Sequence, residues 1–154
     1  MNKNKTLQTI LIWISLIIVA VLGSIFVNLG MDWFMNLNKP NEWIPNILIP
    51  IVWTVIYLTF AIVLSIWANK EKLPKNIIIL LIINGILNIL WCLIFFTLNQ
   101  LLLGNIAIIL NLIFGFKLLF DINRENSLYA WILVIYPTWL SIATTLNLAV
   151  WILN

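Results

Sequence analysis

The sequence predicts an all-α integral membrane protein, a bundle of five transmembrane helices with a structured loop between the first two. Of its 154 residues, 64% are hydrophobic and 8% are charged, whereas a soluble domain averages about 45–50% apolar and about 25% charged residues. Five apolar runs come close to the roughly 20 residues that a helix needs to cross a bilayer. Helices are expected because a lone strand would leave backbone groups unpaired in hydrocarbon. No stretch remains for a second domain, so residues 1–154 form one membrane domain.

The five apolar runs lie at about residues 7–27, 47–67, 77–98, 101–120 and 130–153. We expect the first run to be retained as a span and not cleaved as a signal peptide, because its apolar stretch exceeds the usual length of about 7–15 residues. Most connections between the runs are short. They predict that spans consecutive in sequence pack as antiparallel neighbours.

Basic residues alternate from one side of the predicted bundle to the other. Lys39 stands alone on one side, and the other seven share the opposite side: Lys3, Lys5, Lys70, Lys72, Lys75, Lys117 and Arg124. Cytoplasmic loops collect Lys and Arg, so we expect the N-terminus in the cytoplasm and the C-terminus outside. Lys117 is expected to extend toward the lipid headgroups. Because the basic residues sit at the ends of apolar runs and not on one soluble face, no nucleic-acid partner is expected.

The first connection, residues 29–46, is too long for a plain turn. It contains Trp33, Phe34 and Trp43 together with two prolines, Pro40 and Pro45. These aromatic residues could form an interfacial belt at the membrane surface. Alternatively, the segment could be a folded lid over an opening between the helices, because long loops in compact domains are often functional.

Several kinds of chemistry lack the residues they need. The sequence has no histidine and a single cysteine, Cys92, within an apolar run, so no metal site and no cofactor are expected. The acids lie in loops or at span ends: Asp32, Glu42, Glu71, Asp121 and Glu125. A proton-coupled transporter would therefore lack its usual intramembrane carboxylate. No nucleophile has an adjacent base, which argues against hydrolytic catalysis.

Aromatic and amide side chains recur at helical spacing on three spans. The second span carries Trp53 and Tyr57, four residues apart and so on one face. The other two stripes are Asn84, Asn88, Trp91 and Phe95 on the third span, and Tyr136, Trp139, Ala143 and Asn147 on the fifth. Buried amides are costly in hydrocarbon unless hydrogen-bonded, so these faces should point inward. They could simply hold the bundle together, or they could line a pocket for a flat hydrophobic ligand.

Four motifs in this order resemble the tryptophan-rich sensory protein family, also called translocator proteins or peripheral-type benzodiazepine receptors. They are "WFMNLNKP" from Trp33, "PIVWTVIY" from Pro50, "LNILWCLIFF" from Leu87 and "YPTWLSIATTLN" from Tyr136. Each motif by itself has low specificity. Together, and in this order over nearly the whole chain, the four motifs are specific for the family.

The resemblance implies a membrane receptor or sensor, in a bacterial cell membrane, that often forms homodimers. It also implies binding of porphyrins and isoquinoline-carboxamide drugs beneath the first loop. The corresponding residues here are Trp33, Phe34, Trp53, Tyr57, Asn88, Trp91, Trp139, Ala143 and Asn147. Some bacterial relatives are reported to degrade protoporphyrin with light and oxygen; by that likeness Trp53 and Trp139 would be the reactive residues. Three hypotheses therefore stay open: a tetrapyrrole receptor, a porphyrin-degrading enzyme, or a transporter of small hydrophobic solutes.

The sequence also departs from the family pattern. Phe34 replaces a common tyrosine, and Pro137 follows Tyr136 where the family usually has the proline before it, which predicts an altered kink in the fifth span. The C-terminal "LNLAVWILN" lacks the aromatic and basic pair of the animal cholesterol motif. Without histidine, axial haem ligation is not expected, which favours metal-free porphyrin or a stacked haem. Two pairs of small residues, Ala20 with Ser24 and Ala61 with Ser65, could pack either a dimer or the bundle itself.

Overall fold

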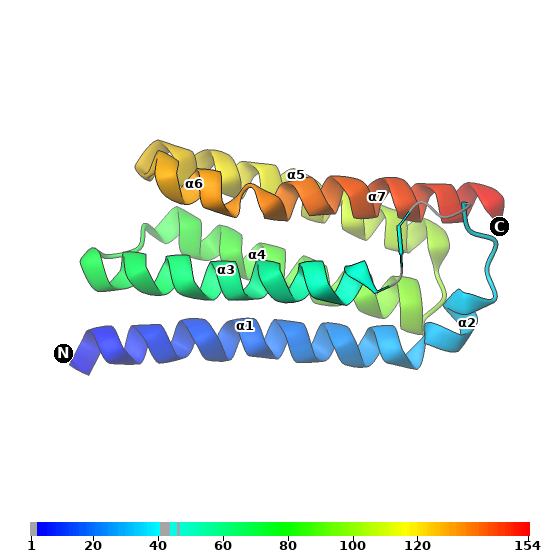
Figure 1. Ribbon diagram of the computed structural model, residues 1–154, viewed down its shortest axis with the longest axis horizontal. Coiled ribbons are helices and arrows are strands. Elements are labelled where there is room, and N and C mark those ends of the chain that lie inside the picture. Colours follow the sequence, from blue (N-terminus) through cyan, green and yellow to red (C-terminus); the bar gives the residue numbers. More distant parts are fainter. Residues whose placement is uncertain (1–2, 41–43, 46) are drawn as a thin grey trace.

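The computed structural model describes residues 3–40, 44, 45 and 47–154, and the regular secondary structure of these residues is helical (Figure 1). Its elements are α1 (Lys3–Leu29), α2 (Met31–Met35), α3 (Leu48–Lys70), α4 (Lys75–Cys92), the π-helical turn η1 (Leu93–Thr97), α5 (Leu101–Glu125), α6 (Ser127–Leu133) and α7 (Ile135–Leu153). In the described residues, five helical segments are long and apolar enough to cross a membrane. The all-α fold with five spans is thus confirmed. Trp43 and Glu42 lie outside the described residues.

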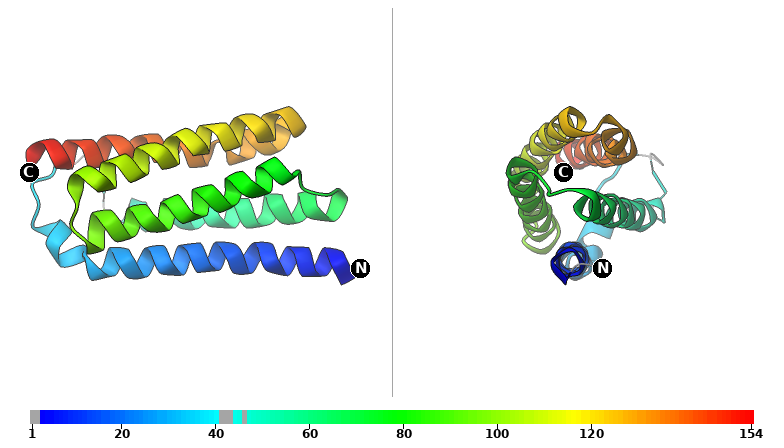
Figure 2. Two further views of the ribbon diagram at one scale, coloured as in Figure 1. Left: turned by 180° about the vertical axis from the view of Figure 1, so that it is seen from behind. Right: turned by 90° about the vertical axis from the view of Figure 1, so that its left-hand side faces the viewer.

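The helices form a ring in which α1 packs against α3 and α4, α5 packs against α4 and α7, and α3 closes the ring against α6 and α7 (Figure 2). The prediction that consecutive spans pack together is wrong for α3 and α4. These two helices are antiparallel but do not pack closely against each other. The space between them is instead occupied by side chains and two cavities, so the interior of the bundle is partly hollow.

Two spans are interrupted where their sequences require it. The fifth span breaks at Val134 between α6 and α7, because Pro137 has no N–H to donate to the carbonyl of Leu133, four residues earlier. The third span widens into η1, where the Leu98 N–H donates to the Leu93 carbonyl five residues back, at 2.9 Å. Such π-turns insert extra backbone into a helix and turn the following side chains to a new direction.

The starts of α1 and α4 and the ends of α3 and α5 gather at one end of the bundle, opposite α2 (Figure 1). We call it the basic end, because Lys5, Lys70, Lys72, Lys75, Lys117 and Arg124 lie there.

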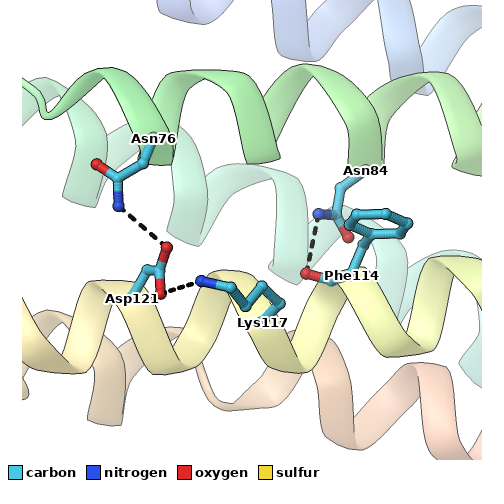
Figure 3. Close-up of polar contacts among 5 residues, drawn as sticks. All are labelled: Asn76, Asn84, Phe114, Lys117 and Asp121. Carbon is cyan, nitrogen blue, oxygen red and sulfur yellow. Dashed lines mark hydrogen bonds and ion pairs between the residues drawn. The ribbon is translucent and has the colours of Figure 1, made fainter.

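Asp121 is buried near the basic end, within α5. The fourth span was predicted to stop at residue 120, but the helix continues to Glu125, so both acids are helical. Asp121 accepts a hydrogen bond from Asn76 of α4 at 3.0 Å and forms an ion pair with Lys117 (Figure 3). Lys117 therefore does more than extend toward headgroups: its ammonium keeps this buried carboxylate paired.

Candidate functional site: an aromatic cavity beneath the first loop

A cavity of about 410 Å³ lies inside the ring, between α1, α3, α4 and α7, at the end of the bundle that holds α2. We call it the aromatic cavity. Eight of the nine residues proposed from the sequence line it: Phe34, Trp53, Tyr57, Asn88, Trp91, Trp139, Ala143 and Asn147. Its volume falls within the range of about 300–1,000 Å³ typical of small-molecule sites. The three stripes at helical spacing therefore converge on one space, except for Asn84, Phe95 and Tyr136, which do not line it.

Trp33 is the exception among the nine. Its indole packs edge-on against Phe95, with ring centroids 6.1 Å apart and an interplanar angle of 73°, and it does not line the cavity. Its neighbour Phe34 is buried and reaches the cavity. Because α2 is helical, these consecutive side chains point in different directions.

One wall of the aromatic cavity is a continuous set of rings. Trp53 stacks on Tyr57 with centroids 5.8 Å apart and planes inclined by 26°, and Trp91 lies 6.1 Å from Trp53 across the interior. Trp53 is half-buried, whereas Trp91 and Trp139 are nearly covered. A wall of this kind offers broad π-faces against which a flat conjugated ligand can stack.

The buried amides divide into two groups. Asn84 belongs to an internal network. Its amide donates to the Phe114 carbonyl at 3.2 Å (Figure 3). In addition, the Tyr136 hydroxyl lies 3.1 Å from the side-chain oxygens of Asn84 and Asn111. Asn88 and Asn147 instead face the aromatic cavity. Asn88 donates to the Tyr57 hydroxyl at 3.3 Å. The bundle-holding interpretation therefore fits Asn84, and the pocket interpretation fits the other two.

Three buried N–H groups on the cavity lining have no hydrogen-bond partner among the described residues. They are Nε1 of Trp91, Nε1 of Trp139 and Nδ2 of Asn147. An indole nitrogen can only donate, and a buried donor left unpaired costs about 1–3 kcal/mol. These nitrogens are covered almost completely, so an acceptor on a molecule in the cavity reaches them only if the side chains rotate.

The first loop closes the α2 end of the bundle and is tied to the end of α7. The Asn38 N–H donates to Asn154 Oδ1 at 3.0 Å, and Asn154 Nδ2 donates to the Asn38 carbonyl at 2.9 Å. Lys39 caps α2 by donating to the Phe34 and Met35 carbonyls, at 2.8 and 2.9 Å. These contacts hold Phe34 over the cavity and favour the lid interpretation of the loop.

Sequence reasoning missed part of the lining. Phe95 was predicted to continue the stripe of Asn88 and Trp91, but Phe96 reaches the cavity and Phe95 is fully buried behind it. The extra backbone of η1 shifts the helical register by one residue, which a strict 3.6-residue period cannot foresee. The polar residues Ser24 and Asn28 of α1 also line the cavity and were not predicted. Their spacing of four within an apolar run was the available signal.

The two pairs of small residues differ in their surroundings. Ala61 is buried and Ser65 accepts a hydrogen bond from Trp13 of α1 at 3.1 Å, so internal packing accounts for that pair. Ala20 and Ser24 line the aromatic cavity, but Ser24 is exposed, so internal packing does not account for it. In addition, the part of the chain that the structure describes has no group of His, Cys, Asp and Glu side chains that could hold a metal ion.

Comparison with known proteins identifies the family of this chain. The family model described as the TspO/MBR family matches residues 11–152. The chain belongs to the TspO/MBR family. It is 30% identical over 156 residues to a tryptophan-rich protein TspO of Chlorobaculum tepidum, covering 98% of this chain and 99% of that protein. Identity to the tryptophan-rich protein TspO of Archaeoglobus fulgidus is 28% over 163 residues, covering 100% and 99%. Protein CrtK of Rhodobacter capsulatus is 29% identical over 125 residues, covering 79% and 78%.

Membership of the TspO/MBR family and the five apolar helices together make this chain an integral membrane protein. Family membership also supports the broad class of membrane sensor or receptor over that of a soluble enzyme.

Proposed function

We propose that the protein is a membrane receptor that binds a tetrapyrrole, such as metal-free protoporphyrin, in the aromatic cavity beneath the first loop. The observation that carries this proposal is the pair of unpartnered indole N–H groups on Trp91 and Trp139. A porphyrin is flat enough to stack on Trp53 and Tyr57, and its carboxylates are acceptors for the two indoles. Isoquinoline carboxamides share this combination of a flat ring and a carbonyl acceptor.

The test replaces each indole by a ring that cannot donate. Trp91→Phe and Trp139→Phe should each weaken protoporphyrin binding by about 3–10-fold, the factor for one hydrogen bond worth about 0.5–1.5 kcal/mol. Trp67→Phe is the matched control, because Trp67 is buried outside the cavity and already donates to Glu71 at 2.9 Å. Binding is measured by the shift of the porphyrin Soret band, so the number of tryptophans does not bias it. Equal affinities in the wild type and both cavity variants would show that the indoles do not contact the ligand.

A second candidate function is light- and oxygen-dependent oxidation of the bound porphyrin. The observation in its favour is the chain of rings from Tyr57 through Trp53 to Trp91, with centroids 5.8 and 6.1 Å apart. In this hypothesis the excited macrocycle takes an electron from Trp53 or Trp139 and passes it to dioxygen, which becomes superoxide. The porphyrin then returns an electron to the indole radical cation, and the resulting porphyrin radical combines with superoxide, so that dioxygen is the net oxidant and the tryptophan is regenerated. Illumination in air should then bleach the Soret band with wild type but not with Trp53→Phe or Trp139→Phe, while argon protects it. Bleaching that is the same with all three proteins favours the receptor alone.

A proton-coupled transporter has less support. Asp121 is the only buried carboxylate among the described residues, and it is bound by Lys117 and Asn76 away from the aromatic cavity. A proton-coupled cycle needs a carboxylate that faces the transported solute.

We also infer that the basic end faces the cytoplasm. The clustering of lysines at that end supports the orientation through the positive-inside rule. Labelling of Lys70→Cys from one side of sealed vesicles tests the orientation.

We further infer that the protein forms homodimers. This inference rests on family membership. Light scattering of the purified protein tests it.

A further inference from the structure

A second cavity, which we call the wedge cavity, lies between α1, α3 and α4 on the basic side of the aromatic cavity. It encloses about 580 Å³. Figure 2 shows α4 diverging from α1 toward the end of the bundle that holds the N-terminus. The back wall comes from buried α3 residues such as Ile56, Phe60 and Leu64, whereas Leu11 of α1 and Ile82 of α4 are exposed on its open side. The wedge cavity therefore opens sideways, toward the lipid.

Hydrogen bonds explain why α1 leaves this space beside α4. Toward the basic end, α1 is tied to α3: Trp13 donates to Ser65 at 3.1 Å, and Asn69 donates to Thr9 at 3.2 Å. At the opposite end, α1 is tied to η1, where Thr97 donates to the Phe26 carbonyl at 2.8 Å. Neither set of hydrogen bonds joins α1 to the first half of α4. The contacts that fix the position of α1 therefore leave the wedge cavity between these two helices.

The lining of the wedge cavity changes from basic to apolar along its length. Its basic end is lined by Lys72 and Gln8, and most of its lateral lining is aliphatic, apart from Phe60 and the polar Ser15, Asn84 and Tyr136. Among the described residues no carboxylate contributes to the lining, and the nearest in sequence, Glu71, accepts a hydrogen bond from Trp67. A positive charge at the mouth of an apolar slot is complementary to an anionic headgroup with a hydrocarbon chain.

The length of the wedge cavity agrees with a chain of lipid. Along α4 the lining extends from Ile78 to Ile89, which is about 16 Å at 1.5 Å per residue. One leaflet contributes about half of a hydrocarbon core roughly 30 Å thick. The slot therefore reaches from the headgroup level to near the bilayer centre, and it ends at Tyr57 and Asn88, which line both cavities.

We propose that the wedge cavity binds one acyl chain of an anionic membrane phospholipid, with the phosphate beside Lys72 and the chain between α1 and α4. This site adjoins the tetrapyrrole site at Tyr57 and Asn88 but differs from it, because none of the tryptophans that the structure describes lines it and its opening faces the bilayer. The sideways opening and the length along α4 favour a lipid over a flat ligand. A lipid in this position would fill the space beside α1 that no side chain occupies.

Native mass spectrometry of the full chain released from detergent tests the proposal. The protein is offered phosphatidylglycerol and phosphatidylcholine with identical acyl chains, and the lipids that stay bound are counted. Wild type should retain one phosphatidylglycerol in preference to phosphatidylcholine. Lys72→Gln should reduce that preference about fivefold, the factor for one lysine beside an anionic lipid. Lys70→Gln, which makes the same charge change outside the lining, should keep it.

A second pair of variants tests the slot itself. Ser15→Phe places a ring in the wedge cavity from the exposed side of α1, and it should cause loss of the bound lipid. Ile17→Phe is the control, because Ile17 is exposed on the same helix and does not line the cavity. Thermal unfolding confirms that each variant is folded. The proposal is overturned if wild type shows no preference for phosphatidylglycerol over phosphatidylcholine. It is also overturned if Lys70→Gln reduces that preference as much as Lys72→Gln does, or if Ser15→Phe still retains a bound lipid.

Discussion

Gly30, at the junction of α1 and α2, makes the closest approach to neighbouring backbone among the five glycines. A Cβ at this position would lie 2.0 Å from the Phe96 carbonyl oxygen and 2.3 Å from its carbon. Ordinary carbon–oxygen contacts begin at about 3.3 Å, so in Gly30→Ala the junction or η1 has to retreat by about 1.3 Å. The clashing atoms belong to the backbone and cannot rotate away. The glycine is therefore required for its lack of a side chain.

Gly30→Ala should destabilise the protein by about 3 kcal/mol, the upper part of the usual range for overpacking. For a chain of this length, 1 kcal/mol corresponds to roughly 2–4 °C, so the midpoint of thermal unfolding in detergent should fall by about 6–12 °C. Porphyrin affinity should fall as well, because Phe34 and Phe96, on the two sides of the contact, both line the aromatic cavity.

Gly23→Ala is the matched control for this prediction. Gly23 also lines the aromatic cavity, but the nearest atom to an added Cβ is Cys92 Sγ at 3.5 Å, an ordinary contact. Alanine is favoured over glycine in a helix by about 1 kcal/mol, so this variant should unfold at the wild-type temperature or slightly above. If Gly30→Ala unfolds at the same temperature as Gly23→Ala, the result would contradict the close contact between the Gly30 backbone and the Phe96 backbone.

Two further predictions concern the polar network and the lid. Tyr136→Phe should lower the unfolding midpoint by about 4–8 °C, because about 2 kcal/mol is lost when the buried oxygens of Asn84 and Asn111 lose their shared donor. Asn154→Ala removes the side chain that holds the Asn38 backbone. It should speed porphyrin dissociation about fivefold, as expected for a loss of about 1 kcal/mol, measured by stopped-flow absorbance.

Each of these variants has a control in the same chain. Tyr129→Phe should leave the unfolding midpoint nearly unchanged, because the Tyr129 ring packs on Trp67 with centroids 5.2 Å apart and does not enter the amide network. Asn36→Ala should leave dissociation unchanged, because the Asn36 side chain donates to the Asp32 carbonyl within its own turn, at 2.9 Å. A midpoint for Tyr136→Phe equal to that of Tyr129→Phe would contradict the network. Dissociation from Asn154→Ala at the wild-type rate would contradict the lid.

The amino-acid sequence predicted the spans and most of the cavity lining because both depend on local periodicity. A helix brings residues three or four apart to one face whatever surrounds it, so Asn88 and Trp91, like Trp139 and Ala143, were assigned to common faces without knowledge of the fold. Hydrocarbon adds a second constraint: amide and indole groups must turn inward wherever the helices lie. The break at Val134 was predictable on the same grounds, since Pro137 removes a backbone donor.

Other features depended on contacts between distant segments and appear only in the tertiary structure. A period of 3.6 residues placed Phe95 in the pocket, but the π-turn shifted the register and brought Phe96 there instead. Short connections predicted that α3 packs on α4, yet α1 packs against both and leaves the wedge cavity between them. Sequence by itself determined which faces are polar within lipid, because helical geometry is local. Long-range packing decided which of those faces meet and what space is left between them. The reason is that a contact stabilises the fold only where its partner, from a distant part of the chain, lies beside it.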